Sequence, residues 1–409
     1  MSMTRGSRKS WQYFGLGLAW FYLLLWPLLG IRDGELHFAD AFAVWLRVAV
    51  GATICFVLYR LGKAGRLDGV LSPLAAARDA VGDALGRAPR WMLLAPVIVF
   101  ALAYPMLTNR YAQDVAINVL VYICLGLGLN VVVGLCGLLD LGYIAFYGVG
   151  AYTYALLSVH YSVPFWVCLP ICAIFAAVAG CFIGYPTLRM RGDYLAIVTL
   201  GFGEIVRIVI NNWMALTGGP NGILGIKSPG IYIPHFVDGS FSFEYLLLRK
   251  LEYLYYIILA LAAFTIVAVH RINFSRIGRA FEAIREDETA AELMGVDTFR
   301  FKLLAYALGA VFGGLAGAFF AARMRFVSPE SFTFIESAMV LAMVVLGGMG
   351  SIPGVILGAL ALVALPEAFR EFELYRMLAF GGAMAVMMLV RPAGLWPAAR
   401  MGKRSDDTE

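Results

Sequence analysis

Residues 271–300 read RINFSRIGRAFEAIREDETAAELMGVDTFR, a polar stretch of thirty residues between two long apolar runs. Its small and apolar residues are not scattered at random. Four of them fall within about a quarter turn of one another on a helical wheel: Phe281, Ile284, Ala291 and Gly295. This narrow stripe predicts weakly amphipathic helices with a face suited to docking.

The same stretch contains helix start and stop signals. Asp287 is well placed as the N-cap of a short second helix through Leu293, and Gly295 is able to adopt the left-handed conformation that ends it. We therefore expect two short helices at a membrane surface. The plainer alternative is a solvated loop that joins two spans.

The composition excludes a soluble globular protein. Of the 409 residues, 61% are hydrophobic and only 14% are charged, whereas soluble domains carry about 25% charged residues. The chain is therefore expected to cross a membrane many times. The six cysteines and four histidines show neither metal-ligand spacing nor a disulfide framework, which argues against a metalloenzyme.

The apolar runs predict an all-α polytopic membrane protein of about 10–12 transmembrane helices. They cover residues 11–30, 39–59, 91–107, 115–134, 141–159, 164–184, 194–210, 253–269, 301–322, 334–349, 353–366 and 374–390. The runs 334–349 and 353–366 are short and close together. They predict either a tight hairpin or a re-entrant element that crosses only in part.

Basic residues predict the orientation. With the N-terminus inside and one crossing per run, 21 of the 32 Lys and Arg residues lie in inner connections and 9 in outer ones. This bias places both termini and residues 271–300 in the cytoplasm. The expected organisation is a two-span extension with a basic loop (1–90), a transmembrane domain (91–397) and a polar cytoplasmic tail (398–409).

Residues 118–157 are rich in small side chains, which allow helix backbones to approach closely in a membrane bundle. The glycines concerned are Gly126, Gly128, Gly134, Gly137, Gly142, Gly148 and Gly150. None of them forms a dinucleotide-binding fingerprint, because the third glycine and the preceding strand are absent.

Charged residues inside a span are candidates for function. Glu204 and Arg207 lie three residues apart on one helix face and are expected to pair; Glu204 is the carboxylate placed clearly inside a span. The pair predicts either a polar substrate path or an internal strut between helices. A turn-rich loop follows on the outer side: Gly218, Gly219, Pro220, Asn221 and Gly222.

Several ordered blocks together resemble one family, the permease subunits of high-affinity branched-chain amino acid ABC importers, and in particular the LivM-type member of the LivH/LivM permease family. The blocks are GLGLNVVVGLCGLLDLGY, LRMRGDYLAIVTLGFGEIVRI, TGGPNGI, REDETAAELMG, FVSPESFTFIESA, VLGGMGSIPG and RPAGLWP, which span roughly Asn118 to Pro397. Permeases for urea and other amides are similar, so the resemblance is weaker for the substrate than for the family.

The resemblance implies that residues 271–300 hold a coupling helix that docks on a cytoplasmic ATPase subunit. Thr289 replaces the leading Glu of the EAA-x-x-x-G pattern found in many ABC importers, and the Ile-x-Leu-Pro that follows it there is missing. The coupling residues are then Glu286, Asp287, Glu288, Thr289, Ala290, Ala291 and Gly295. The Gly218–Gly222 loop would contact a periplasmic binding protein.

The implied function is a permease subunit of the bacterial inner membrane that moves leucine, isoleucine or valine by alternating access. Glu204, Arg207, Asn118 and Asn130 are the candidates for the substrate path. The implied partners are a second, LivH-type permease, two ATP-binding subunits that hold ATP and Mg²⁺, and the binding protein. This chain itself would be no enzyme and would hold no cofactor. The alternatives are an amide permease and an ion-coupled secondary transporter.

Overall fold

The computed structural model describes residues 31–32, 35–36, 90–188, 190, 192–237, 240–248, 250–364, 367 and 394–396. Contacts divide the chain into two units, Met1–Val99 and Phe100–Glu409. In the first unit, β1 (Ile31–Arg32) and β2 (Glu35–Leu36) form a short antiparallel ribbon. The predicted runs 11–30, 39–59 and 374–390 and the polar tail lie outside the described residues, and the predicted domain boundaries stay predictions.

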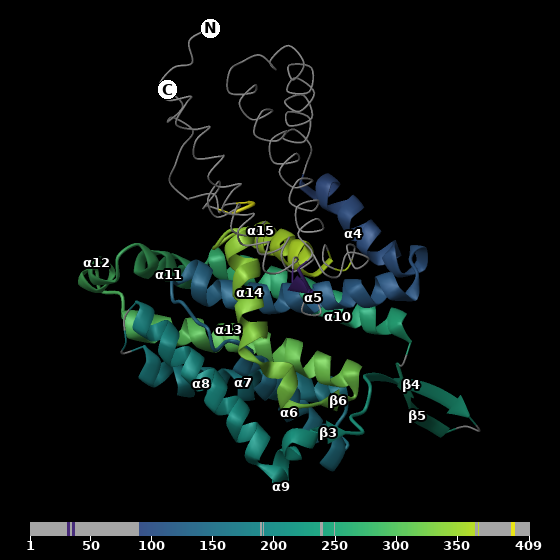
Figure 1. Ribbon diagram of the computed structural model, residues 1–409. Coiled ribbons are helices and arrows are strands. Elements are labelled where there is room, and N and C mark those ends of the chain that lie inside the picture. Colours follow the sequence, from purple (N-terminus) through teal and green to yellow (C-terminus); the bar gives the residue numbers. More distant parts are fainter. Residues whose placement is uncertain are drawn as a thin grey trace. The chain divides into compact units, whose positions relative to one another are not determined.

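From residue 90 onward the structure is almost entirely helical (Figure 1). The helices are α4 (Arg90–Leu107), α5 (Arg110–Asn130), η1 (Val131–Leu135), α6 (Ile144–His160), α7 (Phe165–Thr187), α8 (Asp193–Asn212), α9 (Met214–Thr217), η2 (Gly219–Asn221), α10 (Leu251–Asn273), α11 (Arg276–Glu286), α12 (Glu288–Leu293), α13 (Thr298–Met324), η3 (Pro329–Phe332), α14 (Phe334–Gly347), α15 (Ile352–Ala359) and η4 (Leu360–Ala364). Each apolar run predicted between residues 91 and 364 coincides with a helix.

Two small antiparallel ribbons stand among these helices. β3 (Ile223–Leu224) pairs with β6 (Phe326–Val327), and β4 (Gly230–Val237) pairs with β5 (Ser240–Leu247) in a hairpin. The sequence analysis did not expect the hairpin, because residues 211–250 were interpreted only as an outer connection.

The core is formed where α13 packs against α5, α6 and α7. Small residues make this packing close: a Cβ added at Gly150 of α6 would collide with the carbonyl oxygen of Gly314 in α13. An alanine stripe of α13 continues this contact along the helix. The predicted role of glycines in helix packing is therefore confirmed at the centre of the bundle.

The short runs 334–349 and 353–366 form a tight hairpin. α14 and α15 pack against each other so closely that a Cβ at Gly358 would collide with the carbonyl oxygen of Met343. The structure shows that the two runs fold back on each other, and whether they cross the membrane fully or in part stays a prediction. The last turn of α14 is covered by residues from much later in the chain, because Leu395 and Trp396 donate backbone hydrogen bonds to the carbonyls of Leu346 and Gly347.

Six helices of the described ranges are long and apolar enough to cross a membrane. They are Arg110–Leu135, Phe165–Thr187, Tyr194–Asn212, Leu251–Asn273, Thr298–Met324 and Pro329–Gly347. Ile98–Leu107 and Ile352–Ala364 are apolar but shorter. The chain is a multi-pass, all-α membrane protein.

Candidate functional site

The segment between α10 and α13 has the predicted two-helix form. Ser275 caps α11 by accepting hydrogen bonds from the amides of Ile277 and Gly278 at 3.1 and 3.3 Å. Asp287 caps α12 in the same way, with the amides of Thr289 and Ala290 at 2.9 and 3.0 Å. Both caps satisfy amides that a helix start leaves unpaired.

Gly295 follows α12 with a φ of 87°, the left-handed conformation that was predicted to end this helix. A side chain at this position would be strained whatever space surrounds it. The two predicted helices are therefore confirmed, and their docking on a partner stays a prediction.

The predicted apolar stripe divides into an inner and an outer part. Phe281, Ile284 and Ala291 are buried against the bundle, whereas Gly295 is exposed. Five of the seven predicted coupling residues are exposed: Glu286, Asp287, Thr289, Ala290 and Gly295. Ala291 is buried, and Glu288 turns inward and forms a 2.5 Å ion pair with the nearly buried Lys302 of α13. The outward face is therefore smaller than the predicted set.

Two apolar residues on this face were not singled out from the sequence. Leu293 and Met294, at the end of α12, are 83% and 85% exposed. Their signal in the sequence was an apolar pair next to the terminating glycine of a polar segment. Together with the five exposed residues above, they form what we call the coupling face.

The coupling face is tied to the interior by Arg285. Its guanidinium Nη1 donates a hydrogen bond of 2.5 Å to the carbonyl oxygen of Gly134 in η1, the π-helical end of α5. The side chain also covers Gly137, where an added Cβ would lie 3.0 Å from Cγ of Arg285. A π-helical turn leaves carbonyls with altered partners, so a side-chain donor at this point stabilises the break.

Asn130 continues this connection inside the bundle. It is fully buried, and its Oδ1 accepts a hydrogen bond of 2.8 Å from the amide of Gly350, in the turn between α14 and α15. Its Nδ2 has no hydrogen-bond partner among the described atoms. Asn130 therefore links the end of α5 to the α14–α15 turn. Its predicted role in the substrate path stays a prediction.

The Gly218–Gly222 loop lies at the other end of the bundle from the coupling face. β3 follows the loop and pairs with β6, which follows the C-terminal end of α13, whereas α11 and α12 precede its N-terminal end (Figure 1). The 27 residues of α13 separate the two ends by about 40 Å at 1.5 Å per residue. In the loop, Pro220 and Asn221 are exposed and Gly219 is buried.

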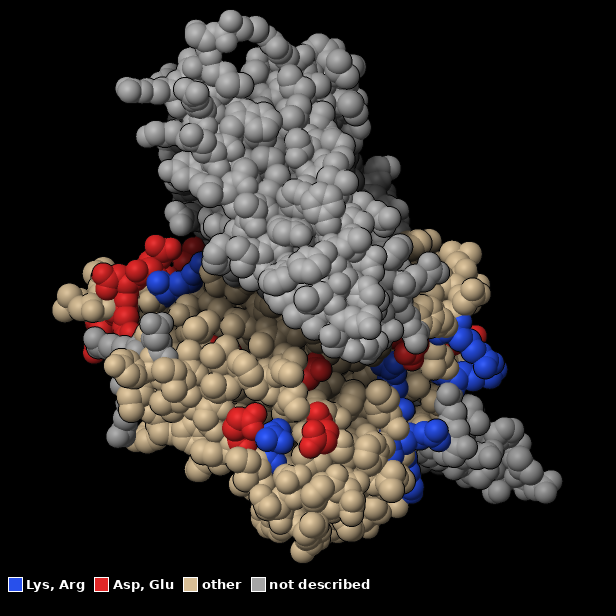
Figure 2. Space-filling view, viewed as in Figure 1, with Lys and Arg blue, Asp and Glu red and all other residues tan. Residues whose placement is uncertain are grey.

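Glu204 and Arg207 form the predicted pair, with 2.8 Å between Nε of the arginine and Oε2 of the glutamate. They lie on a side of α8 that the rest of the described chain leaves open, beside the exposed Gly201, Ile205 and Ile208. Figure 2 shows how few charged atoms interrupt the wide uncharged surface on this side of the molecule. The pair is therefore placed at the periphery of this chain.

A second polar group occupies the interior. Arg323, near the end of α13, donates to Oδ1 of Asn118 at 2.7 Å and to Oδ1 of Asp114 at 2.5 Å, and its side chain is only 7% exposed. A cavity of about 360 Å³ opens beside this group and is lined by Asp114, Ser228, Leu251, Leu254, Arg323, Met324 and Arg325. We call it the outer cavity.

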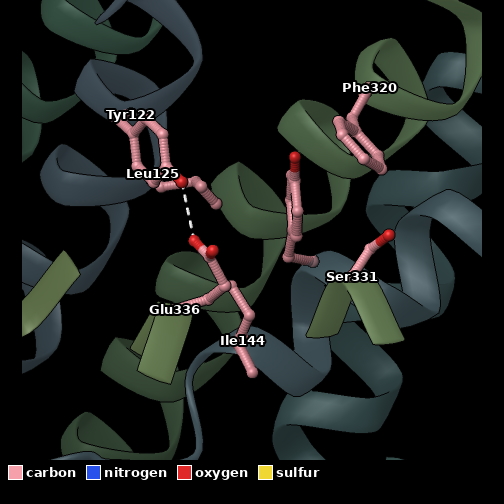
Figure 3. A pocket seen from close by; sticks show the side chains of 7 residues that line it. Tyr122, Leu125, Ile144, Phe320, Ser331 and Glu336 are labelled. Atoms are coloured by element: carbon pink, nitrogen blue, oxygen red, sulfur yellow. Dashed lines mark hydrogen bonds between the residues drawn. The ribbon is translucent and has the colours of Figure 1, made fainter. Parts of the chain in front are cut away.

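A smaller cavity, the inner cavity, has a volume of about 190 Å³. It is lined by Tyr122, Leu125, Ile144, Tyr147, Phe320, Ser331 and Glu336. The hydroxyl of Tyr122 donates a 2.6 Å hydrogen bond to Oε2 of Glu336 (Figure 3). The expectation that Glu204 is the carboxylate inside the spans was therefore incomplete, because Glu336 lies in the first turn of α14.

Comparison with known proteins agrees with this arrangement. Residues 111–391 match the family described as branched-chain amino acid transport system / permease component. The chain belongs to this permease family. It is 43% identical over 403 residues to the high-affinity branched-chain amino acid transport system permease protein LivM of Escherichia coli K12, with 94% of each chain covered.

Other members of the family are similar over shorter ranges. The LivM protein of Salmonella typhimurium is 48% identical over 320 residues, which cover 76% of this chain and 75% of that protein. The LivH permease protein of Escherichia coli K12 is 29% identical over 193 residues, covering 46% of this chain and 60% of that protein. No solved structure matches the chain significantly.

Proposed function

We propose that this chain is a transmembrane permease subunit of an ATP-driven ABC importer that carries leucine, isoleucine and valine across the bacterial inner membrane. The observation that carries the proposal is the coupling face: two capped helices expose Leu293 and Met294 at one end of the bundle, and Arg285 ties them to the broken end of α5. Membership of the branched-chain amino acid permease family supports the substrate class.

The coupling face would dock on one of two ATP-binding subunits, which bind ATP and Mg²⁺ and hydrolyse the nucleotide. Exposed apolar side chains at the tip of a short helix are suited to a groove on a partner. The excess of Lys and Arg in the inner connections supports a cytoplasmic location for this face and for both termini.

At the opposite end, the periplasmic binding protein would deliver its amino acid near the Gly218–Gly222 loop. Pro220 and Asn221 are the exposed residues of this loop, while the glycines give it its shape. Substrate then crosses as the spans alternate between outward-open and inward-open states.

The second, LivH-type permease would pack against the open side of α8. An unpaired charge in the centre of a span costs about 2.5–3.5 kcal/mol even on lenient scales, and a pair exposed to lipid is only partly compensated. Glu204 and Arg207 are 35% and 28% exposed in this chain. A protein neighbour at this surface would shield both.

The importer is tested with the purified assembly in nanodiscs. Leucine-loaded binding protein is expected to stimulate ATP hydrolysis, and urea is expected to leave the rate unchanged. Stimulation by urea alone favours an amide permease, and uptake that follows an ion gradient without any ATPase favours a secondary transporter.

The coupling face is tested in the same preparation with the double variant Leu293→Asp and Met294→Asp. We expect the ATP-binding subunits to dissociate from it, since charges replace the apolar contact. Leu224→Asp is the matched control, because Leu224 is 71% exposed in β3 at the other end of the bundle. Retention of the ATPases by the double variant contradicts the proposed docking surface.

A further inference from the structure

Glu336 is held in an unusual setting for a carboxylate within a span. It is half-buried in Pro329–Gly347 and accepts the hydrogen bond from Tyr122. By contrast, Asp114 is paired with Arg323, and Glu204 is paired with Arg207. Across the described ranges, no ion pair links Glu336 to a basic side chain. Its described neighbours therefore supply a hydrogen bond but no ion pair.

The walls of the inner cavity combine two chemistries. Glu336, Tyr122 and Ser331 supply polar atoms, while Leu125, Ile144 and Phe320 supply apolar surface (Figure 3). Its volume of about 190 Å³ is below the roughly 300–1,000 Å³ of sites for drug-sized ligands. The cavity therefore suits a small solute with a cationic group at one end and an apolar group at the other.

Polar side chains along one face of α5 lead from the outer cavity to the inner cavity. Asp114, Asn118 and Tyr122 are spaced four residues apart on α5 and therefore share one face. The first two contact Arg323, which lines the outer cavity, and the third lines the inner one. Eight residues of helix place the inner cavity about 12 Å deeper.

We propose that the inner cavity binds the primary ammonium group of the transported amino acid, with Glu336 as its counter-charge. The apolar walls then receive the branched side chain. Tyr122 positions the carboxylate while the cavity is empty. This inference rests on the proposed function, since it assigns a binding site to the same transport path.

The other explanation of the Tyr122–Glu336 hydrogen bond is a strut between α5 and α14. The two explanations differ in what each variant does. A strut keeps a hydrogen bond in Glu336→Gln, because the amide oxygen still accepts from the hydroxyl of Tyr122, and loses it in Tyr122→Phe. A counter-charge is lost with Glu336→Gln alone, because Tyr122→Phe keeps the carboxylate.

The test measures displacement of radiolabelled leucine from the complete importer in nanodiscs, without binding protein. Three competitors separate the ends of the ligand: leucine, 3-methylbutylamine, which lacks the carboxylate, and 4-methylpentanoate, which lacks the ammonium group. In Glu336→Gln we expect the affinities for leucine and for the amine to fall about tenfold or more, because a charged partner is lost. The affinity for 4-methylpentanoate is expected to stay constant or rise.

Two further variants complete the test. Glu330→Gln is the matched control, since Glu330 is an exposed carboxylate on η3, six residues before Glu336, and does not line the cavity. It is expected to bind like the wild type, and Tyr122→Phe is expected to retain leucine binding. If the Glu336→Gln importer does not assemble, Glu336→Asp replaces it, because the shorter side chain moves the carboxylate away from the ligand. We expect this variant to bind leucine and the amine more weakly, with binding of 4-methylpentanoate unchanged.

Equal losses for all three competitors, a loss of leucine affinity in Tyr122→Phe at least as large as that in Glu336→Gln, or absence of displaceable leucine binding to the wild type would each overturn the inference. ATP-dependent leucine uptake by the wild-type importer is measured separately. Failure of that uptake overturns the proposed function, whereas normal uptake with unaltered binding by Glu336→Gln overturns the cavity assignment alone.

Discussion

The interior of the bundle and the open side of α8 differ in how far the spans are buried and in where their charged side chains find partners. In the most apolar part of each span, 72% of Arg110–Leu135 and 67% of Thr298–Met324 are buried inside the protein, against 22% of Tyr194–Asn212. Two nearly buried basic side chains of α13 have partners on other helices: Lys302 pairs with Glu288, and Arg323 pairs with Asp114. Glu204 of α8 instead has its partner, Arg207, three residues away. The basic side chains of α13 thus join different helices, whereas the α8 pair lies within one helix.

The largest expected effect comes from introducing a large side chain at a helix contact in the interior, for comparison with the same change on α8. Gly150→Leu forces α6 away from Gly314 of α13, and overpacking costs about 1–3 kcal/mol, or about tenfold in the folded fraction for each 1.4 kcal/mol. We expect a sharp loss of the chain from membranes, measured by quantitative immunoblotting.

Gly201→Leu is the matched substitution on α8, where an added Cβ meets nothing within 4 Å. We expect normal abundance of this chain but loss of the co-purifying second permease. Equal abundance of both variants would show that the interior is not the more tightly packed region.

The next largest effect tests whether the hydrogen bond from Arg285 couples ATP hydrolysis to movement of the bundle interior. Arg285→Ala removes a hydrogen bond from a charged donor to Gly134, which is worth about 1.5–3 kcal/mol. We expect the ATPases to remain bound while the ATP consumed per leucine imported rises severalfold. Arg279→Ala, an exposed change on the same helix, is the control. An unchanged ratio in Arg285→Ala would remove this connection from the mechanism.

A smaller effect is expected at the cap of α12. Asp287→Ala loses a helix cap, at a cost of about 1 kcal/mol. Asp287→Asn keeps a good cap without the charge and should retain leucine-stimulated ATPase activity, while Asp287→Ala should lower it about fivefold. If both variants lose activity equally, the charge and not the cap is what the coupling face requires.

The smallest effect is expected for Glu204→Gln. A partly exposed ion pair contributes about 0.2–1 kcal/mol, so co-purification of the second permease should fall by no more than about fivefold. Leucine uptake per assembled complex is expected to stay constant. Reduced uptake at unchanged assembly would instead place Glu204 in the substrate path.

Local patterns explain why part of this structure could be predicted from the sequence. The apolar runs, the Asp287 cap, the left-handed Gly295 and the Glu204–Arg207 pair each depend on residues within one or two helical turns. Their geometry is set locally along the chain, and the structure shows each of those that fall in the described residues.

The interior polar groups depend on distant residues. Arg323 contacts Asp114 across 209 positions, Tyr122 contacts Glu336 across 214, and Arg285 reaches Gly134 across 151. Their partners are set by how the helices pack, which a single sequence does not encode as a pattern. The sequence therefore pointed to Asn118 and Asn130 as polar residues without revealing that one contacts Arg323 and the other Gly350.

The covering of α14 by Leu395 and Trp396 has a consequence for biosynthesis. The carbonyls of Leu346 and Gly347 receive their hydrogen bonds from residues made about fifty positions later. At about 5–20 residues per second, the ribosome needs several seconds to supply them. During that interval the α14–α15 hairpin carries unsatisfied carbonyls in the membrane, where they are costly. A chaperone or insertase that shields this hairpin would act in that interval, and a nascent chain stalled before residue 395 would expose it to proteolysis.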